Sequence, residues 1–203
     1  MTGDYTSHIF WIGSRAAGIV AMTMLTFTVI VGLAQGGRLP LGVKARDLTR
    51  VHEFVSLAAL VAIVVHGALL IFDPWLKATV TELLVPFKLD YRPLYSGLGI
   101  VGAWIAMTLG LSYYARDRIG INRWKTLHRF TIVAWALCVV HVLGAGSDAG
   151  EAWLKGPVIA STGVIVVMFA LRVLSRPAPA RQQRSSYRSM PHARPTPAPT
   201  LHR

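Results

Sequence analysis

Four histidines lie in two long apolar stretches, and their spacing is nearly the same in both. His52 and His66 are 14 residues apart in VHEFVSLAALVAIVVHGALL, and His128 and His141 are 13 apart in TLHRFTIVAWALCVVHVLG. An imidazole ring without a partner is costly in hydrocarbon. Imidazole is also a common metal ligand. The two pairs therefore indicate ligand chemistry inside a membrane.

The rest of the sequence must supply helices that position these rings. Hydrophobic residues make up 53% of the 203-residue chain, charged residues only 15%, and the mean hydropathy is +0.49. A membrane-spanning helix needs about 20 mostly apolar residues. Five stretches qualify, at 11–33, 53–72, 95–114, 130–146 (long enough when it starts at Thr126) and 157–174. We predict an all-α integral membrane bundle of five transmembrane helices.

The net charge of +12 is distributed unevenly along the chain. Basic segments at 34–52, at 115–129 and in the tail alternate with near-neutral segments at 73–94 and 147–156. Cytoplasmic segments of membrane proteins carry the excess of Lys and Arg. We therefore predict a multi-pass protein of the cell membrane with its N-terminus outside and its C-terminus cytoplasmic. The charge pattern favours contact with membrane lipid and argues against nucleic-acid binding.

The chain divides into a transmembrane domain at 1–175 and a tail at 176–203. The tail, RPAPARQQRSSYRSMPHARPTPAPTLHR, is rich in Pro, Arg and Ser and has little to bury, so it is predicted to be disordered. Small residues in the first and third spans, Gly18 and Gly99 among them, are interpreted as faces for close helix packing. Trp135 is interpreted as a core or lipid-facing residue, with an electron relay as the alternative.

The predicted topology makes the second and fourth spans parallel. His52 then lies at the depth of His128 near the cytoplasmic face, and His66 at the depth of His141 near the outer face. The two levels are about 20 Å apart, at ~1.5 Å per helical residue. A straight fourth helix, however, would leave His128 and His141 offset by about 140°.

Two imidazole pairs at two depths fit two b-type haems, because two facing helices can each supply one axial nitrogen. Zinc fits less well, since its structural sites gather four ligands in one place. The haem propionates need basic groups at the membrane interfaces. Arg129 is the candidate inside, with Arg50, Arg123 and Lys125 nearby, and Arg15 is the candidate outside, with a snorkelling arginine as the alternative.

The stretches RVHEFVSLAALVAIVVHG and WKTLHRFTIVAWALCVVH resemble the paired-histidine helices of the ferric reductase-like transmembrane domain family. This family includes NADPH oxidases, ferric reductases and the bacterial haem-binding subunit of the methionine sulfoxide reductase system. The resemblance covers about 11–174. It implies two haems b that pass electrons across the membrane, an inner one on His52 and His128 and an outer one on His66 and His141. The chain differs from the family in having five predicted spans instead of six and no fused FAD/NADPH domain.

The leading hypothesis is a dihaem cytochrome subunit of an oxidoreductase, which exchanges electrons with a separate redox protein, for which a flavoprotein is the candidate. One alternative is a haem-free accessory protein that uses histidines as a proton relay. A relay favours ionisable groups at intermediate depths, and the sequence has none between the paired histidines after Glu53 and Arg129. The other alternative is a one-haem variant in which one pair is structural.

Overall fold

The computed structural model describes residues 3–37 and 45–174, and every regular element in these ranges is helical. The long helices are α1 (Gly3–Gly37), α2 (Ala45–Ile71), α4 (Pro93–Leu111), α7 (Thr131–Ala145) and α8 (Ala152–Leu174). The short ones are α3 (Val80–Leu84), the 3₁₀ turn η1 (Ser112–Ala115), α5 (Arg116–Ile119) and α6 (Ile121–His128). The tail predicted at 176–203 lies outside the described residues.

Five segments of the described chain are helical, long and apolar enough to cross a membrane, as predicted. They are His8–Gln35, Arg46–Ile71, Pro93–Ile119, Ile121–Ala145 and Ala152–Leu174. Large apolar side chains cover their outer surfaces; Phe54 is 73% exposed and Val61 is 62% exposed. Such surfaces are stable in lipid and not in water. The chain is a multi-pass membrane protein.

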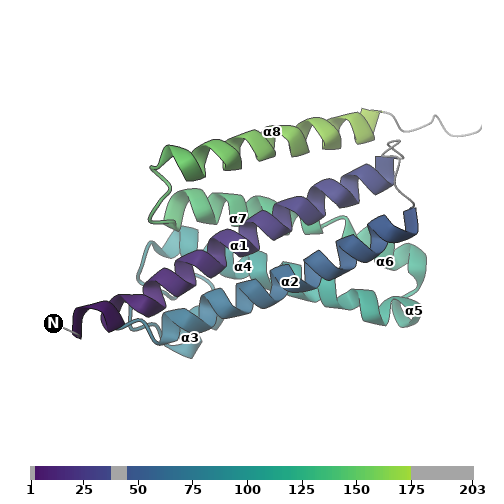
Figure 1. Ribbon diagram of the computed structural model, residues 1–203. Coiled ribbons are helices and arrows are strands. Elements are labelled where there is room, and N and C mark those ends of the chain that lie inside the picture. The colour runs from purple at the N-terminus through teal and green to yellow at the C-terminus, as the bar shows by residue number, and fades with distance from the viewer. Residues whose placement is uncertain (1–2, 38–44, 175–203) are drawn as a thin grey trace, which may run out of the picture.

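The bundle consists of two antiparallel helix pairs and a flanking helix. Helix α1 packs along α2, α4 packs along α7, and α8 lies against α1 (Figure 1). The buried core between α1, α7 and α8 contains Trp135, which is 4% exposed and donates its indole N–H to the Thr26 hydroxyl at 3.1 Å. Trp135 is thus a core residue. Helices α5 and α6 lie at the same end of the bundle as the start of α2, and α3 lies at the opposite end (Figure 1).

The fourth span is present, but it is not one straight α-helix. Helix α6 ends at His128, and α7 begins at Thr131. Across this break Phe130 N–H bonds to Leu127 C=O at 3.0 Å, and Val133 N–H bonds to Phe130 C=O at 2.9 Å. These bonds join residues three apart and wind the chain more tightly than an α-helix, by about 20° per residue. The extra rotation turns His128 and His141 toward a common face and reduces the offset expected for a straight helix.

Candidate functional site

The four histidines form two pairs between the parallel helices that carry them. The ring centroids of His52 and His128 are 6.1 Å apart, with an interplanar angle of 78°. Those of His66 and His141 are 6.2 Å apart, at 73°. All four side chains are half-buried. The structure therefore places two similar imidazole pairs at two levels of the bundle, an inner pair (His52 and His128) and an outer pair (His66 and His141).

The ring separations fit a metal ion between each pair. A metal–imidazole bond of about 2.0 Å, plus about 1.1 Å from the nitrogen to the ring centre, gives a separation of about 6 Å for two rings on opposite sides of one ion. No group of three or more His, Cys, Asp or Glu suited to a metal occurs among the described residues. Pairs of ligands suit an iron whose four other positions are filled by a macrocycle.

The outer rings are oriented by backbone carbonyls of neighbouring helices. Nδ1 of His66 lies 2.8 Å from the Ser14 carbonyl oxygen in α1, and Nδ1 of His141 lies 2.9 Å from the Tyr95 carbonyl oxygen in α4. A carbonyl only accepts, so each Nδ1 carries the proton, and in the neutral ring Nε2 keeps its lone pair. The Ser14 hydroxyl, 3.0 Å from His66 Nδ1, donates to the His66 carbonyl at 2.9 Å. Both outer rings are thus held in the tautomer that leaves Nε2 free to bind a metal.

Glycines on the neighbouring helices make room for three of the rings. A Cβ on Gly18 would lie 3.0 Å from Nδ1 of His66, and one on Gly32 would lie 3.3 Å from Cε1 of His52. A Cβ on Gly99 would overlap the His141 ring. In helices, residues four apart share a face. Gly18 therefore lies on the face of α1 that presents the Ser14 carbonyl, and Gly99 on the face of α4 that presents the Tyr95 carbonyl.

The inner rings lack this anchoring. Nδ1 of His52 and Nδ1 of His128 are both buried without a hydrogen bond of normal geometry. The nearest backbone acceptors are the Thr28 carbonyl for His52 and the Leu109 carbonyl for His128, and neither meets hydrogen-bond geometry. His128 is instead stacked on the indole of Trp124, with centroids 4.9 Å apart and planes at 27°. An aromatic contact thus takes the place of a hydrogen bond at the inner level.

A cavity of about 860 Å³ opens beside the outer pair, and both His66 and His141 line it. Its size and largely apolar wall suit a large planar ligand. Arg15 lines the same cavity, forms an ion pair with Asp148 and lies over the Trp11 ring at 5.1 Å. Asp73, also in the wall, is 2% exposed and has one carboxylate oxygen without a hydrogen bond. Arg15 therefore lies where a negatively charged edge of a ligand at the outer pair would meet it.

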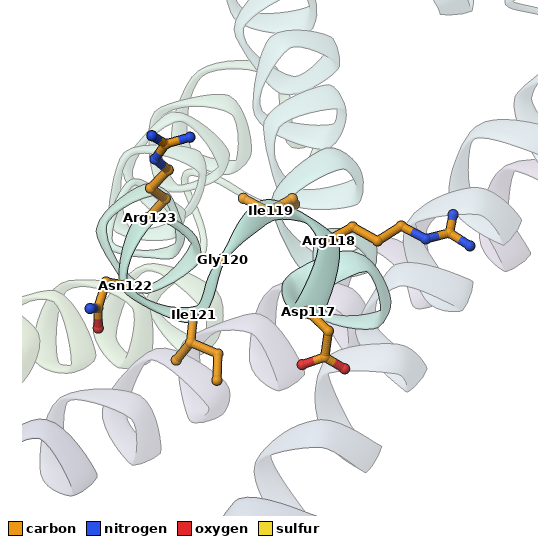
Figure 2. Close-up of a pocket in the computed structure, with 7 residues that line it drawn as sticks. All are labelled: Asp117, Arg118, Ile119, Gly120, Ile121, Asn122 and Arg123. Carbon is orange, nitrogen blue, oxygen red and sulfur yellow. The ribbon is translucent and has the colours of Figure 1, made fainter.

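Arg129, the predicted inner counterpart of Arg15, is in a different environment. It caps the end of α6 and its side chain is exposed. A hollow of about 580 Å³ at the start of α6 is lined by the turn from Asp117 to Arg123, but its side chains do not converge. Figure 2 shows Arg118 and Arg123 pointing to opposite sides of the turn. The inner level thus has basic groups nearby, and those of the α5–α6 turn do not converge on one point.

Sequence reasoning assigned Gly18 and Gly99 to helix packing and did not connect them with the histidines. A signal was present: Gly18 and Gly32 are 14 residues apart, as are His52 and His66 on the adjacent antiparallel helix. Matching intervals on two packed helices bring one glycine to each histidine. The contact of Trp124 with His128 also had a signal, because the two residues are four apart and lie in the same helix, α6.

A family profile described as ferric reductase-like transmembrane component matches residues 17–139. The matched region includes His52, His66 and His128 and ends two residues before His141. Comparisons with curated proteins and with solved structures gave no significant match. The profile covers more than half of the chain, and the chain belongs to the ferric reductase-like transmembrane component family.

Proposed function

We propose that this protein is a dihaem b-type cytochrome subunit that carries electrons across the membrane. The inner haem is assigned to His52 and His128, and the outer haem to His66 and His141. The observation that carries the proposal is the repetition of one ring arrangement, with centroids 6.1 and 6.2 Å apart, at two levels. Membership of a family whose domains generally bind haem supports it.

The proposed roles of the residues follow from their contacts. Ser14 and Tyr95 hold the outer imidazoles with Nε2 toward the partner ring, and Trp124 holds His128 by stacking. Arg15, which Asp148 and Trp11 keep in the cavity wall, binds a haem propionate. Haem held by two imidazoles supplies one-electron exchange without an open coordination position. Substrate is therefore not expected to bind the iron of the intact protein.

Electron donor and acceptor are proposed to be separate molecules, one of them a redox protein, for which a flavoprotein is the candidate. The start of α2 and the segment that forms α5 and α6 are rich in basic residues and lie at one end of the bundle, which supports a cytoplasmic position for that end (Figure 1). On this assignment the N-terminus is outside and the C-terminus is cytoplasmic. The inner pair then lies near the cytoplasm, and the outer pair near the exterior.

The test is the haem content of purified wild-type and variant protein, measured with a reduced-minus-oxidised spectrum and a haem-to-protein ratio. His52→Ala and His128→Ala should each remove the inner haem, and His66→Ala and His141→Ala should each remove the outer one. The double variant His52→Ala/His128→Ala should lose no more haem than either single variant, because both residues serve the same site.

Four outcomes would contradict the proposal in different ways. Wild-type protein without haem would favour a proton relay, and half the expected content would favour a one-haem protein. Joint loss of a single haem by His52→Ala and His66→Ala would mean that the pairs are wrongly assigned. Rapid, stoichiometric CO binding by the wild-type protein would show an open iron position and exclude bis-imidazole ligation.

A further inference from the structure

The stack on His128 continues beyond Trp124 toward the end of the bundle. Trp124 is fixed by its indole N–H, which donates to the Ser112 hydroxyl at 3.1 Å. Its ring meets the Tyr113 ring edge-on, with centroids 5.7 Å apart and planes at 63°. The Arg116 guanidinium lies 4.0 Å from the centroid of Tyr113 and donates to the Tyr113 carbonyl at 2.9 Å. An unbroken series of contacts thus runs from a proposed haem ligand to an arginine at the start of α5.

The series ends in a surface of strongly positive charge. From Arg116 to Arg129 the chain carries five basic residues and one acidic residue, Asp117. Arg118 and Arg123 are exposed and spread away from each other across the α5–α6 turn (Figure 2). At the other end of the bundle the 147–156 connection has only Lys155 against Asp148 and Glu151. Attraction of anions is therefore specific to the end that carries the stack.

The positive-inside rule accounts for the basic charge of the α5–α6 turn but not for the aromatic contacts that lead from it to His128. Cytoplasmic loops are basic in most membrane proteins, whatever their function. Trp124 and His128 share a face of α6 because they are four residues apart, but the positive-inside rule does not place the Tyr113 ring and the Arg116 guanidinium behind the tryptophan. Aromatic rings in contact shorten the through-space gap that an electron must cross. The coincidence of the stack with the basic turn is the observation that needs explanation.

We propose that the series Trp124–Tyr113–Arg116 is the contact through which the inner haem exchanges electrons with an anionic donor at the α5–α6 turn. The proposal rests on the dihaem function above. A protein donor would present an acidic surface around its redox group, because opposite charges steer encounters and orient them. Trp124 then has two roles, orienting the His128 ring and carrying the electron toward it.

The experiment measures the rate of haem reduction by stopped flow in purified haem-loaded protein at low salt. Dithionite is the anionic donor, and reduced methyl viologen is the cationic one. Trp124→Leu should slow reduction by both donors severalfold, because it breaks the stack. Tyr113→Leu should do the same without touching the ligand, and Tyr113→Phe should restore the rate. Phe169→Leu, which removes an exposed aromatic ring on α8 and outside the stack, should leave both rates unchanged.

Charge is tested separately with Arg118→Gln/Arg123→Gln. This variant should reduce about tenfold more slowly with dithionite at low salt, and the difference should vanish at high salt. Its rate with methyl viologen should not fall. Lys155→Gln, at the opposite end, is the matched control. The same measurements in a His66→Ala/His141→Ala background report the inner haem alone.

The haem spectrum of each variant is recorded before its reduction rate, so that a loss of haem is distinguished from slower electron transfer. Absence of haem from the wild-type protein would contradict the proposed function. Intact haem spectra with unchanged rates in Tyr113→Leu and in the arginine variant would overturn the present proposal and leave that function standing. Unchanged rates together with weaker adhesion of the arginine variant to anionic lipid vesicles would assign the basic turn to lipid headgroups, and the proposal would be wrong.

Discussion

The outer and inner histidine pairs have nearly the same ring separation, but different contacts hold them in place. At the outer level both rings donate hydrogen bonds to backbone carbonyls, of Ser14 and Tyr95. At the inner level neither Nδ1 has such a bond, and His128 is stacked on Trp124. The outer pair lines a cavity of about 860 Å³, and the inner pair lies beside a broken helix and a basic turn.

This difference shows that one ligand arrangement can be produced by two kinds of support. The outer rings depend on how closely α1 approaches α2 and α4 approaches α7, because a backbone carbonyl cannot move without its helix. The inner ring of His128 depends on the path of α6, whose side chains orient it. Substitutions that widen the helix spacing should therefore affect the outer level most, and substitutions in α6 the inner level.

The largest effect is expected for Gly99→Ala. The new methyl group would overlap the His141 ring and push it off the Tyr95 carbonyl. Overpacking of this kind costs about 1–3 kcal/mol. We expect loss of the outer haem and retention of the inner one, measured by the haem-to-protein ratio. Gly163→Ala, where a Cβ meets nothing within 4 Å, is the control. Equal loss at both levels would show that the two supports are not independent.

Gly18→Ala and Gly32→Ala, both in α1, compare the two levels with smaller clashes than Gly99→Ala. At Gly18 the methyl group would lie 3.0 Å from the hydrogen-bonded Nδ1 of His66, and at Gly32 it would lie 3.3 Å from Cε1 of His52. Alanine also stabilises a helix by about 1 kcal/mol relative to glycine, and this gain offsets the milder clash at Gly32. We expect Gly18→Ala to lower outer haem content and Gly32→Ala to leave the inner haem in place. Loss of the inner haem in Gly32→Ala with retention of the outer haem in Gly18→Ala would mean that the His52 ring is held more rigidly than its missing hydrogen bond indicates.

The smallest effect is expected at the ion pair of the outer level. Asp148→Asn removes the partner of Arg15, whose side chain is 34% exposed and therefore partly screened by solvent. We expect a loss of about 1 kcal/mol, or roughly 2–4 °C in the thermal midpoint of protein purified in detergent. Asp117→Asn, on the exposed α5–α6 turn, should cause no loss. A large fall in outer haem content without a change in midpoint would show that Asp148 acts on the ligand and not on the fold.

The membrane class and the five spans could be predicted from the sequence because they depend on local properties. The length of an apolar run decides whether it can cross a bilayer, and that length is read directly. The pairing of His52 with His128 and of His66 with His141 also followed from local properties, since spacing and parallel direction fix relative depth. The structure places both pairs as these arguments predicted, and their role as haem ligands stays a prediction.

Only the tertiary structure decided how each ring is held. The break at Arg129 and Phe130 has no proline or glycine to announce it, and without it His128 and His141 would point to different faces. The contacts of Gly99 with His141 and of Trp124 with Tyr113 arise from the approach of separate elements in three dimensions. Helix spacing and rotation are set by the packing of all neighbours at once, so no stretch of sequence specifies them alone. Sequence thus determined which residues share a depth, and packing determined which atoms meet.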